Sequence, residues 1–204
     1  MKQLETLQSE LGEKVPKIVL GKFYNLTLVK IPLAKNRKTP DYKIFNNTEL
    51  IAISEVKSCV SIIGPADINL ETSYEEIAEI SKKRDKNHRS KLGKHHDKAL
   101  SQLPNDQNLP TVIIFVSFDM TDYIDMGMML QDHKETYPSA SMADVYVLIK
   151  IHQGIIPSNN FEIKETIRVM YNTEAGRYFS EKYFPLIPAL QNAGTLPLVF
   201  TAEA

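Results

Sequence analysis

The segment from Leu50 to Val56 limits the possible folds more than any other part of the sequence. Side chains alternate between the two faces of a strand, and here both alternating sets are apolar: Ile51 and Ile53 form one set, and Leu50, Ala52 and Val56 form the other. A strand of this kind is covered on both faces. We therefore expect a sheet with helices on each side, which is an α/β fold.

The remaining patterns agree with that class. Strands are expected over residues 23–31, 42–45, 50–56, 111–118, 144–151 and 161–170. Helices are expected over residues 2–11, ended by Gly12 and Pro16, then from Ser73 to Leu103, and over 120–131, with helical segments from about 174 to 192. We find no internal repeat and no linker composition, so residues 1–204 are expected to form a single domain.

Composition excludes several classes of protein. The chain has 204 residues with a formal net charge of −1, which argues against a protein that coats nucleic acid non-specifically with its whole surface. No apolar run reaches the length of a membrane span, and the polar N-terminus lacks the apolar core of a secretory signal. The one cysteine, Cys59, cannot form an internal disulfide. We expect a cytoplasmic protein that makes no membrane contact.

Three charged residues frame the hairpin that residues 42–56 are expected to form around Asn46-Asn47-Thr48-Glu49. Asp41 opens its first strand, and Glu55 and Lys57 lie two residues apart on one face of the second. Depending on the register, Asp41 lies opposite position 54 or 55. Opposite Glu55, the two carboxylates would lie about 5 Å apart between Cβ atoms. Such a pair suits Mg²⁺, and Lys57 would offer an ammonium to a water nucleophile or to a phosphodiester.

These residues resemble a known family. Thr39-Pro40-Asp41, thirteen intervening residues and then Glu55-Val56-Lys57 at the end of an apolar strand are similar to the motif of the PD-(D/E)XK nuclease superfamily, the restriction-endonuclease-like fold. The expected order of helix, three-stranded meander, helix and strand is also similar over residues 1–118. Residues 119–204 form an α/β extension without such a resemblance.

The resemblance implies a Mg²⁺-dependent nuclease, with Mn²⁺ as an alternative cation and DNA as the expected substrate. It implies that Asp41 and Glu55 bind the metal and that Lys57 is the catalytic lysine. Many members add an acidic residue from the first helix, and Glu10, beside the Leu4, Leu7 and Leu11 stripe, is the choice here. Members often pair to cut both strands, which makes a homodimer one of the oligomeric states that the sequence leaves open.

Two basic segments are candidates for contact with the phosphate backbone. Residues 82–98 carry eight lysine or arginine residues against two aspartates, and a second group precedes Asp41 directly. The candidate nucleic-acid-binding residues are Lys35, Arg37, Lys38, Lys82, Lys83, Arg84 and Arg89.

Two alternatives stay open. The first is a surface hairpin that ends in an ordinary Glu/Lys pair. The second is an inactive nucleic-acid-binding or regulatory protein of the same fold. In that protein, salt bridges to Lys57 and Arg37 would occupy the two carboxylates, or more than about 6 Å would separate them, so that they could not share one ion.

Overall fold

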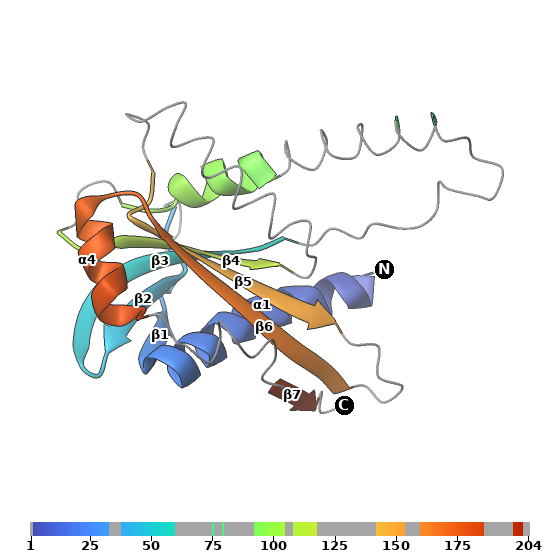
Figure 1. The fold of residues 1–204 in the computed structure, drawn as a ribbon. Coiled ribbons are helices and arrows are strands. Elements are labelled where there is room, and N and C mark those ends of the chain that lie inside the picture. Colours follow the sequence, from blue (N-terminus) through green and yellow to red (C-terminus); the bar gives the residue numbers. More distant parts are fainter. Residues whose placement is uncertain are drawn as a thin grey trace.

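Seven strands form one mixed sheet in the order of the chain (Figure 1). They are β1 (Leu26–Lys30), β2 (Tyr42–Asn46), β3 (Glu49–Cys59), β4 (Thr111–Ser117), β5 (Val145–Gln153), β6 (Asn160–Tyr171) and β7 (Leu198–Thr201). The computed structural model describes residues 2–32, 38–59, 92–104, 108–117, 142–153, 160–185 and 198–201, together with Glu75 and Glu79. The central strands β3, β4 and β5 run parallel, and the other neighbouring strands pair antiparallel.

Helices cover both faces of this sheet. Helix α1 (Lys2–Tyr24) lies on one face, where Val15, Val19 and Leu20 pack in one core with side chains of the central strands. The helix described over residues 92–100, light green in Figure 1, lies on the other face, where Leu92 and Ala99 pack in a second core. The α/β class and the two-sided burial of β3 are therefore confirmed.

Helix α1 is longer than the sequence suggested. The expected end at Gly12 and Pro16 is wrong, because the helix continues through Pro16 to Tyr24. Gly12, Val15, Pro16, Val19 and Leu20 are all buried and follow helical spacing along one stripe. Packing of this stripe on the sheet outweighs the backbone hydrogen bond that proline removes. Tyr24 is the last helical residue, and Asn25 after it has a φ of 53°, a left-handed conformation common after a last helical turn.

Gly12 allows α1 to approach β3 closely. A Cβ at this position would lie 2.8 Å from Cβ of Ser58, closer than two such carbons can pack. Ser58 directly follows Lys57 and points to the opposite face of the strand. The glycine therefore marks a tight contact between helix and strand, and it is not a helix terminator.

Of the helical segments expected from about residue 174 to 192, the structure describes helix α4 (Glu174–Tyr183), and residues 186–192 lie outside the described residues. Helix α4 ends before Phe184, because Phe184 precedes Pro185 and a residue before proline is disfavoured in helical conformation. Strand β7, which pairs antiparallel with β6, was not expected. The helix expected at 120–131 and the helix start expected at Ser73 lie outside the described residues. Among the described helices, none combines the length and apolar character needed to cross a membrane.

Candidate active site

A β-bulge sets the register between β2 and β3. Next to the turn, Phe45 pairs with Leu50, but beyond the bulge Ile44 pairs with Ala52. Ile51 is thus the extra residue on β3. The ladder continues to the pair of Tyr42 and Ser54. One further step places Asp41 opposite Glu55.

Without the bulge, the pairing that starts at the turn would set Asp41 opposite Ser54. The side chain of Ser54 points to the face opposite that of Glu55, so the two carboxylates would not meet. Bulges commonly redirect side chains next to active sites. Here the bulge decides between the two registers that the sequence left open, in favour of the one that brings Asp41 and Glu55 together.

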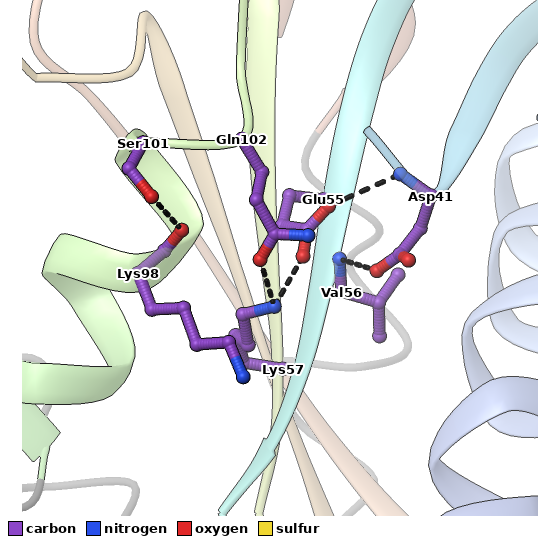
Figure 2. A network of polar contacts seen from close by, with 7 residues as sticks. All are labelled: Asp41, Glu55, Val56, Lys57, Lys98, Ser101 and Gln102. Carbon is purple, nitrogen blue, oxygen red and sulfur yellow. Dashed lines mark hydrogen bonds and ion pairs between the residues drawn. The ribbon is translucent and has the colours of Figure 1, made fainter. Parts of the chain in front are cut away.

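The two carboxylates are held by a reciprocal exchange of hydrogen bonds (Figure 2). The backbone N–H of Asp41 donates to Oε2 of Glu55 at 3.1 Å, and the backbone N–H of Val56 donates to Oδ2 of Asp41 at 3.0 Å. Each side chain therefore accepts a backbone donor from the opposite strand. Since strand backbone is rigid, this exchange fixes both carboxylates without using any mobile side chain.

Lys57 connects Glu55 to the helix on the same face of the sheet. Its ammonium forms an ion pair with Oε1 of Glu55 and donates to Oε1 of Gln102 at 2.9 Å. Gln102 follows the helix of residues 92–100 and approaches from across the site in Figure 2. The Lys57 side chain is 13% exposed, whereas Glu55 is fully buried. The surface-hairpin alternative is therefore wrong.

Burial changes the proton affinity of Glu55. Loss of hydration raises the pKa of its carboxyl from 4.5 to about 7; the hydrogen bond from Lys57 opposes this rise, and the nearby Asp41 adds to it. Because burial destabilises the ionised form of Glu55, a further positive charge beside it would stabilise that carboxylate. Either a proton or a cation can supply that charge.

The raised pKa predicts how stability depends on pH. The folded protein keeps a proton on Glu55 up to about pH 7, whereas the unfolded chain releases it near pH 4.5. This group therefore favours the folded state most below the unfolded pKa, and its contribution is lost as the pH rises through the folded pKa, by roughly 3 kcal/mol in total. Urea unfolding in EDTA between about pH 4 and pH 8 should show that fall in wild type relative to Glu55→Gln. A pH-independent difference between the two proteins would contradict the assignment.

The donor set of Asp41 and Glu55 fits a hard divalent cation. Mg²⁺ is commonly bound by one or two carboxylates, with water and substrate phosphate completing its octahedron. Asp41 and Glu55, which hydrogen-bond across facing strands, supply two carboxylates of this kind, and Glu55 is buried. Within the described part of the chain, no cluster of three or more His, Cys, Asp or Glu side chains has metal-binding geometry. Among the described residues, Asp41 and Glu55 are the two that could hold such a cation.

A second carboxylate network, at Asp144, is structural. Asp144 accepts from the backbone and hydroxyl of Thr111 and from the hydroxyl of Thr173, the residue that caps α4. These bonds tie the starts of β4, β5 and α4 together. In contrast to Glu55, this carboxylate has no basic partner among the contacts described.

The other residues expected at the site are only partly placed. Lys38 is exposed three residues before Asp41, and Lys94 and Lys98, from the basic segment of residues 82–98, are exposed one turn apart on the helix of residues 92–100. The backbone of Glu10 belongs to α1, but its side chain falls outside the description, so its role stays a prediction. Also outside the described residues are Lys35, Arg37, Lys82, Lys83, Arg84 and Arg89.

Gln102 is the residue of this site that sequence reasoning missed. It lies 45 positions from Lys57 and carries no motif, so no spacing in the sequence links the two. The available signal was a polar residue just after a helix that leads, through a loop, to a buried strand. In an α/β fold, residues just after such a helix can lie close to side chains of the neighbouring strand.

Comparison of the chain with models of protein families, with curated proteins and with solved structures finds no significant match.

Proposed function

We propose that this chain is a metal-dependent nuclease that hydrolyses phosphodiester bonds of nucleic acid, with DNA as the expected substrate. The observation that carries this proposal is the reciprocal hydrogen bonding of Asp41 and Glu55, with the ammonium of Lys57 at Glu55. Two facing carboxylates that can hold a cation, with a lysine beside them, are groups that can promote hydrolysis of a phosphodiester.

The arrangement of elements supports a restriction-endonuclease-like core. Helix α1 precedes the antiparallel meander β1, β2 and β3, the helix of residues 92–100 follows, and β4 pairs parallel with β3. This is the order implied by the resemblance of the sequence to the PD-(D/E)XK superfamily. The strands β5, β6 and β7 extend that core.

Asp41 and Glu55 are the residues that would hold the cation, with Glu10 of α1 as a further candidate. A bound Mg²⁺ or Mn²⁺ would polarise the scissile phosphodiester and acidify a water. The strand backbone at Asp41 and Val56 holds the carboxylates in place. Lys57, mostly buried beside Glu55, offers an ammonium to the attacking water or to the phosphate oxygens.

The exposed lysines support nucleic acid as the substrate class. Lys94 and Lys98 lie on the helix that also supplies Gln102, and Lys38 lies just before Asp41. Neutralisation of phosphates by lysine and arginine supplies much of the affinity of nucleic-acid-binding proteins. We expect these lysines to contact the backbone near the cleaved bond, and binding to weaken as salt is raised.

A second candidate function is favoured by one contact. The ion pair of Lys57 and Glu55 occupies a carboxylate oxygen, which is one of the two salt bridges expected in an inactive protein of this fold; the other, to Arg37, lies outside the described residues. If that pair is permanent, the chain binds nucleic acid without cutting it. The two candidates differ in whether a divalent cation can take the place of the ammonium on Glu55.

A cleavage assay tests the proposal. Linear duplex DNA, single-stranded DNA and RNA are incubated with the protein in Mg²⁺, in Mn²⁺ and in EDTA. Products that need the cation are expected on at least one DNA substrate. Salt-sensitive binding of DNA without products under any of these conditions would favour the inactive protein, and the absence of both would reject nucleic acid as the substrate.

A further inference from the structure

We propose that Gln102 is a positioning residue that receives the ammonium of Lys57 when Glu55 binds a divalent cation. This inference rests on the proposed cation site and deepens it. The observation behind it is that one ammonium is shared by two acceptors of different charge, Oε1 of Glu55 and Oε1 of Gln102.

Lys57 and a cation would compete for the carboxylate of Glu55. The oxygen Oε2 of Glu55 accepts from the backbone of Asp41, and Oε1 is paired with Lys57. A cation and an ammonium on the same carboxylate oxygen repel each other and compete for the same lone pairs. Lys57 must therefore move away from Glu55 Oε1 before this oxygen can bind a cation.

Gln102 offers an acceptor for the Lys57 ammonium once that ammonium has left Glu55. The Lys57 side chain is mostly buried, so an ammonium that has left Glu55 still needs an acceptor close by. Gln102 Oε1 is already 2.9 Å from Nζ and carries no charge. A neutral acceptor holds the ammonium without attracting the cation, and it keeps Lys57 beside the position where phosphate and water would react.

An apolar residue at position 102 could not accept a hydrogen bond from Lys57 as glutamine does. Leucine at position 102 would fill nearly the same volume but would offer no oxygen. Lys57 would then keep Glu55 as its acceptor among the contacts described, and cation binding would have to strand a buried ammonium. The Gln102→Leu variant should therefore bind Mn²⁺ about tenfold more weakly, as expected when a metal site loses an outer hydrogen-bond partner.

The test is a double-mutant cycle read by calorimetric titration with Mn²⁺ alone. Wild type, Gln102→Leu, Lys57→Met and the double variant are compared. If Gln102 acts through Lys57, the loss of Mn²⁺ affinity on Gln102→Leu disappears in the Lys57→Met background. An equal loss in both backgrounds, or no loss in either, overturns the proposal.

Two further variants separate positioning from stability. Gln102→Asn keeps a neutral amide acceptor on a shorter side chain and should lower Mn²⁺ affinity less than Gln102→Leu does. Ser101→Ala removes a neighbouring hydroxyl that donates to the carbonyl of Lys98, and it should leave Mn²⁺ affinity unchanged. If Ser101→Ala lowers the affinity as much as Gln102→Leu does, the effect comes from disturbing the helix end, and the proposal fails.

Cleavage kinetics of the Gln102→Leu variant distinguish the proposed role of Gln102 from the proposed nuclease activity. Gln102→Leu should lower kcat with little change in KM, because the cation and Lys57 are disturbed while the surface lysines are not. If the Mn²⁺ affinities follow the expected double-mutant cycle but the wild type cleaves no nucleic acid, the nuclease proposal is rejected and the role of Gln102 is kept. If the wild type cleaves DNA and Gln102→Leu equals it in Mn²⁺ affinity and kcat, the nuclease proposal is kept and the role of Gln102 is rejected.

Discussion

In Mg²⁺ or Mn²⁺, the Glu55→Gln variant is expected to cleave DNA at least about a thousandfold more slowly than wild type, a loss of about 4 kcal/mol of transition-state stabilisation. The amide keeps the shape of the carboxyl, so the backbone N–H of Asp41 keeps an acceptor at this position. It removes the charge that would hold the cation. Cleavage rates measured at saturating cation, beside unfolding curves of both proteins, separate loss of chemistry from loss of fold.

The chain contains a matched control for this variant. Glu162 and Lys164 repeat the Glu-x-Lys spacing on strand β6, without a preceding Pro-Asp strand that faces them. Glu162→Gln should therefore cut as fast as wild type. If Glu55→Gln retains wild-type activity, or if the two variants lose activity equally, Glu55 is not a ligand of the reacting cation.

Much of the sheet follows from local sequence. The two-sided apolar pattern at residues 50–56 indicated a central strand, and the asparagine turn indicated its hairpin, where Asn47 adopts a φ of 54°. Both results depend on short-range rules: side-chain alternation, and the tolerance of asparagine for left-handed backbone. Short-range rules apply equally well whatever the rest of the chain does.

The register of the hairpin could not be obtained in the same way. Alternation fixes a register only when one face of a strand is apolar and the other polar. Because residues 50–56 are apolar on both sets, an extra residue at Ile51 changes nothing in the pattern. The feature that identified β3 as a central strand thus concealed the bulge that brings Asp41 opposite Glu55.

Long-range packing explains two further differences. Gly12 and Pro16 disfavour a helix locally, yet they lie on the buried stripe of α1, and Gly12 permits the close approach to Ser58. Gln102 reaches Lys57 only because β4 pairs parallel with β3, which requires a helix to cross one face of the sheet. Both features depend on which elements become neighbours, and this information is absent from a local window of sequence.

Replacing Lys57 by methionine is expected to have opposite effects on catalysis and on cation binding. Cleavage should slow by about a hundredfold or more, as found when a preorganised donor is removed from a reacting centre. Mn²⁺ affinity should rise, because methionine fills the volume of the lysine stem without placing a positive charge on Glu55. The hydrogen bond from Lys57 opposes the raised pKa of Glu55, so without it a proton competes more strongly, and the titration is best made near pH 9.

Lys43→Met provides the control for that variant, since Lys43 lies exposed on β2, two residues after Asp41. It should change neither cation affinity nor kcat. Tighter Mn²⁺ binding with slower cleavage in Lys57→Met alone would mean that the ammonium has two roles: it neutralises Glu55 before the cation binds, and it assists the reaction afterwards. Weaker Mn²⁺ binding in Lys57→Met near pH 9 would instead show that the ion pair holds Glu55 in place for the cation, and competition between ammonium and cation would have to be abandoned.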